Sequence, residues 1–191
     1  MKLFIDTETT GKANFRASPT AKHQPRIVQL AALLTDDKGD EAASFCFVLK
    51  PEGFIIPCEV SSIHAITHEF ATANGIASGM AMEMLRELAL LADTYVAHNV
   101  GFDALMVAIE ADRMVCDLRD TLLQRSKWFC TMNATTPICK LPGNYGDYKW
   151  PKLQEAFTHC FGQPFDGAHD ALADVRACKR VYFWLQEHKT A

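Results

Sequence analysis

Three extended segments within the first 50 residues constrain the fold most strongly. Residues 2–7 form a short apolar stretch, and Ile27–Thr35 and Ala43–Leu49 carry the composition of two further strands. A four-residue Asp-Asp-Lys-Gly turn separates the second strand from the third. We therefore expect the three strands to form an antiparallel meander, with residues 12–25 as a loop between the first two.

The rest of the chain alternates helices and strands. Ser78 is expected to cap a helix that runs to about Leu91, because Met84, Leu85, Leu88 and Leu91 recur at helical spacing and form its core face. After Pro51 we expect an irregular stretch. The remaining elements are expected as a strand at Thr94–Ala97, a helix capped by Asn99, a helix over 117–127, a strand at Phe129–Met132, a long loop over 133–149, and helices over 151–161 and 170–187. This order predicts an α/β layered fold.

The composition predicts one globular domain over residues 1–191. The chain is 49% hydrophobic and 22% charged, with a formal net charge of −4. This balance excludes a protein that coats nucleic acid by bulk positive charge, so any cationic surface must be local. The N-terminus reaches Asp6 without a signal-peptide apolar stretch, and no apolar run approaches the ~20 residues that span a bilayer. We expect a soluble, cytoplasmic protein without membrane contact.

The seven cysteines show neither a Cys-x-x-Cys pair nor a regular spacing. An odd number without a framework argues against a secreted disulfide scaffold and against a structural zinc site. We interpret them as reduced thiols that pack as small apolar side chains.

Asp6 and Glu8 lie two residues apart at the end of the first strand. Side chains alternate across a strand, so both carboxylates should point to one face and Thr7 to the other. Neighbouring carboxylates repel each other, and hard divalent cations with oxygen ligands remove this repulsion. The pair alone is a weak signal, because a solvated strand end has the same pattern.

Two further acidic positions lie where helices are expected to begin. Asp103 lies one turn beyond Asn99, and Asp174 lies in the first turn of the last helix, which Asp170 is expected to cap. A carboxylate near a helix N-terminus is favoured by the helix dipole and stays ionised, as a metal ligand must.

Three blocks together resemble the exonuclease motifs of the DnaQ-like (DEDDh) 3′–5′ exonuclease family. The blocks are Asp6-Thr7-Glu8-Thr9-Thr10-Gly11, His98 to Asp103, and His169 to Asp174, in the family's order and over nearly the whole chain. That family includes the proofreading subunit of bacterial replicative polymerase, ribonuclease T and oligoribonuclease. The resemblance implies a ribonuclease H-like fold, a five-stranded mixed sheet with helices on both sides. It also implies two Mg²⁺ ions, for which Mn²⁺ can substitute.

The resemblance also implies a role for each residue of the site. Asp6 would bridge both cations, Glu8 and Asp174 would complete one cation site, and Asp103 would hold the second cation. His169 would be the general base that takes a proton from the attacking water, because a histidine titrates near neutral pH. The residues implied to contact the terminal nucleotide are Thr9, Thr10, His64, Asn99 and Phe102. For Phe102, packing in the core is an equal alternative.

The substrate is expected to be the 3′ end of DNA, single-stranded or frayed, with release of nucleoside 5′-monophosphates. A 3′–5′ exoribonuclease is the alternative, and a non-catalytic nucleic-acid-binding protein on the same fold is a remote one. A polymerase partner is possible, but the sequence ends soon after Asp174, which favours a free-standing nuclease or a short proofreading-like protein. The sequence leaves the oligomeric state open.

Two basic segments allow two interpretations each. Lys12, Arg16, Lys22 and His23 are expected to lie in a solvated loop, with guidance of the phosphate backbone as the alternative. Lys149, Trp150 and Lys152 fit a small basic-aromatic patch, but we favour Trp150 and Leu153 as anchors of the following helix.

Overall fold

The computed structural model describes residues 1–114, 127–144 and 146–188. Five strands form one sheet in the order β3-β2-β1-β4-β5. Their bounds are β1 Lys2–Thr9, β2 Ile27–Thr35, β3 Glu41–Val48, β4 Thr94–Ala97 and β5 Trp128–Cys130. β1, β2 and β3 pair antiparallel, whereas β4 pairs parallel with β1 and with β5. The predicted meander and the predicted mixed five-stranded sheet are both confirmed.

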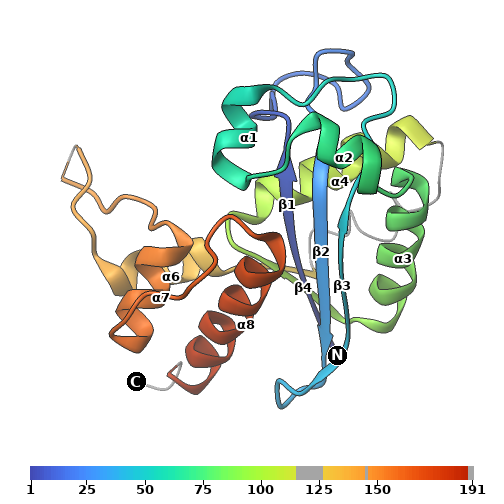
Figure 1. Cartoon of the computed structure of the whole chain (residues 1–191). Helices are drawn as coiled ribbons and strands as arrows, with labels where there is room; N and C mark the ends of the chain where they lie inside the picture. The colour runs from blue at the N-terminus through green and yellow to red at the C-terminus, as the bar shows by residue number, and fades with distance from the viewer. Residues whose placement is uncertain (115–126, 145, 189–191) are drawn as a thin grey trace.

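Helices cover both faces of this sheet (Figure 1). The helices in the described residues are α1 Cys58–His64, α2 His68–Asn74, α3 Ser78–Leu91, α4 Val100–Met114, α6 Thr131–Cys139, α7 Leu153–Phe161 and α8 Ala171–Glu187. α3 and α4 pack on one face and α8 on the other, with α6 and α7 against α8. The N-terminal ends of α4 and α8 therefore lie at the edge of the sheet where β1 ends.

The alternation of side chains along β1 divides the core into two layers. Leu3 and Ile5 are fully buried against α3 and α4, whereas Phe4 is fully buried against α8. β2 is buried along its whole length because both faces of this interior strand are covered. The even-numbered face of β1 therefore points toward α8.

Two segments that were predicted to be irregular are helical. α1 and α2 lie in the stretch after Pro51, and each is too short to show a helical repeat in the sequence. α6 occupies the first part of the predicted loop over 133–149, and β5 ends at Cys130 instead of Met132. Pro137 suggested a break, but it lies near the end of α6, where the missing N–H removes a single helical hydrogen bond.

Both predicted helix caps before residue 110 were wrong, as was part of one helix face. Ala77 holds the N-cap position of α3, so Ser78 is the first helical residue. Asn99 has a left-handed backbone with φ 69°, not the extended conformation of an N-cap residue. In α3 Leu85 and Leu88 are buried as predicted, while Met84 and Leu91 are 43% and 60% exposed.

The remaining predictions have mixed outcomes. The helices predicted over 151–161 and 170–187 are α7 and α8, and Asp170 caps α8. The helix predicted over 117–127 falls almost wholly outside the described residues. Six of the cysteines are free thiols, as expected, and the seventh lies outside the described residues. Within the described part of the chain, no helix has the length and apolar character needed to cross a bilayer.

Candidate active site

β1 delivers the first two carboxylates to the face of the sheet that α8 covers. Asp6 lies opposite Ala31 and Glu8 opposite Gln29, and the register shifts between Glu8 and Thr9. β4 pairs with β1 as far as Phe4, so Asp6 and Glu8 extend past the end of β4. The prediction that both side chains share one face agrees with the alternating burial of the strand.

Thr7 points to the opposite face, where it meets the third carboxylate. The Thr7 hydroxyl donates a hydrogen bond to Asp103 Oδ1 at 2.9 Å, in a buried position. Asp103 lies in the first turn of α4 and is 3% exposed. The Phe102 N–H donates to the Asn99 carbonyl over 2.8 Å, which closes the turn that begins α4. Thr7, which lies between Asp6 and Glu8, therefore holds Asp103 at the end of β1.

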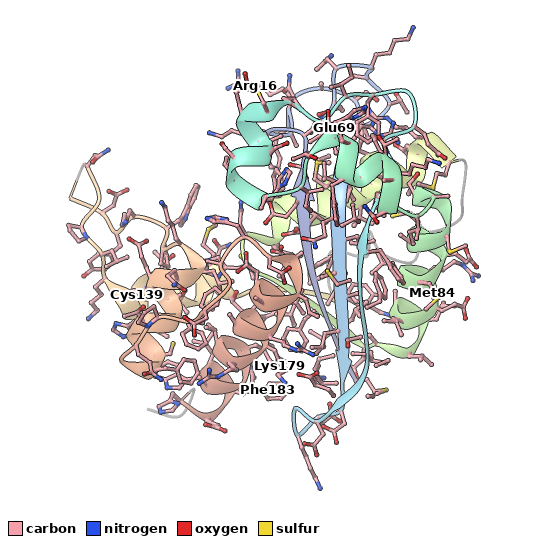
Figure 2. The ribbon with its side chains drawn as sticks, in the orientation of Figure 1. Arg16, Glu69, Met84, Cys139, Lys179 and Phe183 are labelled. Carbon is pink, nitrogen blue, oxygen red and sulfur yellow. The ribbon has the colours of Figure 1, made fainter. Side chains whose placement is uncertain are left out.

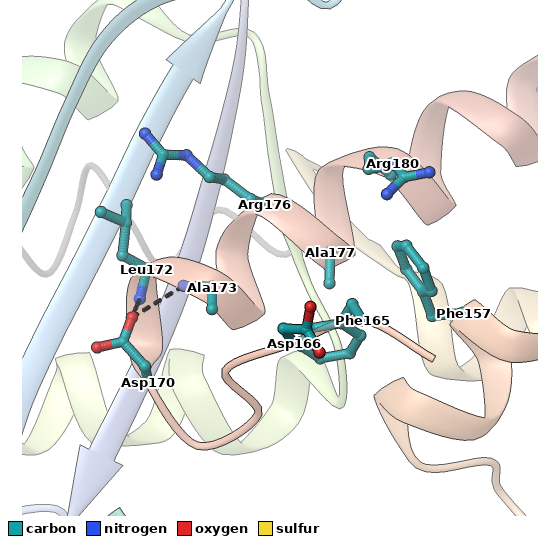
Figure 3. A pocket seen from close by; sticks show the side chains of 9 residues that line it. All are labelled: Phe157, Phe165, Asp166, Asp170, Leu172, Ala173, Arg176, Ala177 and Arg180. Carbon is teal, nitrogen blue, oxygen red and sulfur yellow. Dashed lines mark hydrogen bonds between the residues drawn. The ribbon is translucent and has the colours of Figure 1, made fainter. Parts of the chain in front are cut away.

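The N-terminus of α8 supplies the fourth carboxylate and the histidine. Asp170 Oδ1 accepts hydrogen bonds from the N–H groups of Leu172 and Ala173, as the dashed lines in Figure 3 show. One turn on, Asp174 Oδ2 accepts the backbone N–H of His169 over 3.2 Å. His169 is exposed and has a left-handed backbone with φ 71°. The turn before α8 therefore fixes His169 against Asp174.

Gln29 ties this helix to the sheet. Gln29 is 8% exposed on β2, and its Oε1 atom accepts the N–H of Ala171 over 3.2 Å. Because Gln29 lies opposite Glu8 in the register, the same strand position aligns the end of β1 with the start of α8. Gln29 and the role of Thr7 were not predicted, since neither residue type stands out within a strand.

Burial raises the pKa of all four carboxyl groups, and the charges of neighbouring carboxylates raise it further. Desolvation, followed by the charge of Asp103, holds the pKa of Asp6 well above its ordinary value. Desolvation and then Asp174 raise the pKa of Glu8 to about 7. Burial raises the pKa of Asp103 to about 7 despite the Thr7 hydrogen bond, and burial raises that of Asp174 to about 6. Closely spaced carboxylates with raised pKa values are the environment that a bound cation relieves.

The donor set fits divalent metal ions. Glu8, His169 and Asp174 each offer a ligand atom, and these three atoms lie within 4.8 Å of one another. Asp174 Oδ1 is buried without a hydrogen-bond partner, so a lone pair remains for a cation. Carboxylate oxygens with one imidazole suit Mg²⁺, Mn²⁺ or Zn²⁺. His169 is therefore near enough to act either as a base or as a ligand.

His64 and Phe102, two of the residues predicted to contact the substrate, have different surroundings. His64 is 6% exposed; its Nδ1 atom accepts the Ile66 N–H over 3.1 Å, while its Nε2 atom is buried without a partner. Burial and then the nearby His169 lower the pKa of His64, so His64 lies beside the site. Phe102 is partly buried and packs against the core cluster of α3 and α4. This packing is the predicted alternative for Phe102, and it leaves the residue partly exposed.

Thr9 and Thr10 are fixed by the loop that follows them. The Thr9 hydroxyl donates to the Gly11 carbonyl, and Thr10 exchanges two hydrogen bonds of 2.9 Å with the backbone of Arg26. The Arg26 guanidinium in turn binds the fully buried Glu110 of α4 through contacts of 2.8 and 3.1 Å. Lys12, Arg16, Lys22 and His23 of this loop are exposed, as expected.

A strand end with two carboxylates, joined by one carboxylate from each of two helices on a mixed five-stranded sheet, is the arrangement expected of a metal-dependent nuclease with a ribonuclease H-like fold. The exonuclease family model (ribonuclease T type) matches residues 3–182. The chain belongs to this exonuclease family, which confirms the predicted DnaQ-like assignment. Membership in the family implies dependence on a divalent metal ion.

Three solved structures of exonuclease I have a similar fold. Exonuclease I from Methylocaldum szegediense superposes with a TM-score of 0.77 at 22% identity, over 98% of this chain and 40% of that one. The E. coli exonuclease I complex with a dT13 oligonucleotide gives 0.77 at 22% identity, over 98% and 41%. The zinc-bound E. coli exonuclease I complex with single-stranded DNA gives 0.78 at 22% identity, over 98% and 40%.

These matches confirm the fold. The chain spans about two fifths of the length of each of these exonuclease I structures. A search of curated protein sequences found no match.

Proposed function

We propose that the protein is a 3′–5′ exonuclease that removes nucleotides from the 3′ end of single-stranded or frayed DNA and releases nucleoside 5′-monophosphates. The observation that carries this proposal is the convergence of Asp6, Glu8, Asp103 and Asp174, with raised pKa values and a buried unpartnered oxygen on Asp174. The exonuclease I complexes with DNA oligonucleotides support DNA as the substrate.

Two divalent cations, Mg²⁺ or Mn²⁺, would be held by these four carboxylates, with Asp6 shared between them. Such a pair stabilises the charge on the attacking and leaving oxygens of an in-line displacement at phosphorus. His169 would take the proton of the attacking water, since its ring lies beside Glu8 and Asp174. The left-handed turn and the hydrogen bond to Asp174 hold His169 in this position.

The terminal nucleotide would lie between the end of β1 and α1. Thr9 and Thr10 would contact it from the loop side, together with Asn99 and Phe102 at the start of α4. His64 would donate from Nε2, because its Nδ1 atom is occupied as an acceptor. This donor is buried without a partner, so a polar group of the nucleotide would satisfy it.

The test is a panel of 5′-labelled substrates: single-stranded DNA, duplex DNA with a mismatched 3′ end, and single-stranded RNA, each with Mg²⁺ and with EDTA. We expect a ladder of DNA products shortened from the 3′ end with Mg²⁺, and no products with EDTA. Preferential shortening of RNA would replace DNA with RNA as the substrate. Internal cuts, or immediate release of the labelled 5′ nucleotide, would refute the proposed polarity.

A further inference from the structure

The described residues between α6 and α7, 140–144 and 146–152, form an arm that projects from the body of the protein (Figure 1). The arm is closed by a bridge between Pro142 and Tyr148 and by a hydrogen bond of 3.0 Å from the Lys149 N–H to the Leu141 carbonyl. At its base Pro151 is buried, and the Pro151 carbonyl accepts a hydrogen bond of 2.9 Å from His98 Nε2. Hydrogen bonds therefore hold the backbone at residues 149 and 151, on both sides of Trp150.

Two aromatic side chains on this fixed backbone face solvent. Trp150 is 70% exposed and Tyr148 is 48% exposed. The expectation that Trp150 anchors the following helix was therefore wrong, whereas Leu153 does pack into the core. An exposed tryptophan on a rigid support is typical of a surface that binds a partner with a flat apolar face.

The base of the arm is joined directly to the strand end that leads into the candidate active site. His98 follows β4 and precedes α4, whose first turn carries Asp103. His98 Nδ1 also lies 3.0 Å from the Thr131 hydroxyl, so the ring is held between the arm and α6. Trp150 therefore directly precedes Pro151, whose carbonyl contacts His98 in the segment between β4 and α4.

The charge of the segment suits a polyanion. Lys140, Lys149 and Lys152 are exposed in the same segment as the two aromatic residues; Asp147 is an exposed acidic residue of this segment, and Lys149 binds Glu155 at 2.6 Å. The net charge of the whole chain is −4, so this cationic group is a local exception to an acidic protein. Flat apolar faces combined with phosphates are the chemistry of unpaired nucleotides.

We propose that Tyr148 and Trp150 form a stacking platform for unpaired bases of the substrate strand, upstream of the nucleotide that is removed. The lysines beside the platform contact the phosphates of the same strand. This inference rests on the proposed nuclease function and adds a second contact point for the strand. The platform contributes to binding and lies outside the cluster of four carboxylates and His169. Its loss should therefore weaken the binding of long substrates and leave the hydrolysis of a mononucleotide ester unchanged.

The test compares Trp150→Ala with Trp150→Phe, which retains an aromatic face, and with Met84→Ala as a matched control. Met84 is 43% exposed on α3, and Figure 2 places it across the molecule from Cys139 of α6. The substrates are an oligothymidine of about 12 nucleotides and the p-nitrophenyl ester of thymidine 5′-monophosphate. For the oligonucleotide, Trp150→Ala should raise KM about 5-fold to about 150-fold, with kcat nearly unchanged.

Hydrolysis of the small ester by Trp150→Ala should equal that of the wild type, and Trp150→Phe should recover most of the affinity for the oligonucleotide. Equal KM values of Trp150→Ala and Met84→Ala for the oligonucleotide would overturn the platform. If the wild type hydrolyses neither substrate, the nuclease proposal fails. The platform is then tested by fluorescence anisotropy of the labelled oligonucleotide with Ca²⁺, where the same ranking of variants is expected and equal affinities would refute it.

Discussion

Thr7 and Asp103 are joined by a buried hydrogen bond of 2.9 Å across 96 residues of sequence. The bond links the strand that carries Asp6 and Glu8 to the helix that carries Asp103. It also occupies one lone pair of Oδ1 and orients the carboxylate group. Thr7 is thereby a positioning residue for the proposed cation site.

Thr7→Val should weaken divalent cation binding while the fold is retained. Loss of a hydrogen bond to a metal ligand typically lowers metal affinity about 10- to 100-fold, because the ligand is no longer oriented. The measurement is the Tm of each variant titrated with Mn²⁺, which gives an apparent Kd. Thr7→Ser keeps the hydroxyl and should bind like the wild type. Equal Mn²⁺ affinity in Thr7→Val would show that Thr7 does not position Asp103.

The clustered carboxyl groups predict an unusual dependence of stability on pH in EDTA. The pKa values of Glu8 and Asp103 are raised to about 7 and that of Asp174 to about 6, whereas unfolded carboxyls titrate near ~4. Between these values the folded state binds more protons than the unfolded state. The free energy of unfolding contributed by these groups should therefore fall as pH rises from about 5 to about 8.

The measurement is Tm at pH 5 to 8 in EDTA and again with saturating Mn²⁺. Bound cations favour the ionised carboxylates, so the decline with pH should disappear when Mn²⁺ is present. Glu8→Gln removes one of the titrating groups and should flatten the decline in EDTA. Carboxyls with lowered pKa values, such as Asp36 and Glu155, lose their contribution below this window. Burial lowers the pKa of His64 and His98, which adds stability as pH rises through the same range, so the contribution of the carboxyls is the difference between the wild type and Glu8→Gln. Identical pH profiles of Tm for these two proteins in EDTA would contradict the electrostatic account.

Gln29→Leu should destabilise the protein and impair the site together. The Ala171 N–H would lose its acceptor in a buried position, which costs about 1–3 kcal/mol in the free energy of unfolding. Asp174 lies three residues further along α8, so kcat should also fall. Urea denaturation and initial rates check both effects. Gln163→Leu, at an exposed position, should change stability by less than about 0.5 kcal/mol; a similar loss in both variants would contradict the role of Gln29.

The sequence predicted the strands and the acidic residues better than it predicted the helices that connect them. Asp6 and Glu8 were placed correctly because the period of a strand fixes the face of each side chain. α1 and α2 were missed because one or two helical turns carry no repeat, and Ser78 was misplaced because a cap and a first helical residue have similar composition. Gln29 and Thr7 depend on contacts between distant segments, which no local pattern encodes.

His169→Gln distinguishes a general base from a metal ligand. A base contributes typically about 100-fold to about 10,000-fold in rate, so kcat should fall by that amount while the apparent Kd for Mn²⁺ changes little. If His169 instead completes the group formed with Glu8 and Asp174, the Mn²⁺ affinity should fall in parallel with the rate. The thermal titration described for Thr7 provides the second readout.

The most direct test of the central claim is cleavage of 5′-labelled single-stranded DNA by Asp6→Asn at saturating Mg²⁺. Asn is isosteric with Asp but lacks the charge that the proposed shared cation ligand needs, and Asp6 interacts electrostatically with the other three carboxylates. We predict that folded Asp6→Asn shows no stepwise shortening under conditions in which the wild type digests the strand from its 3′ end. Wild-type rates of Mg²⁺-dependent shortening in Asp6→Asn would contradict the assignment of this carboxylate cluster as the active site.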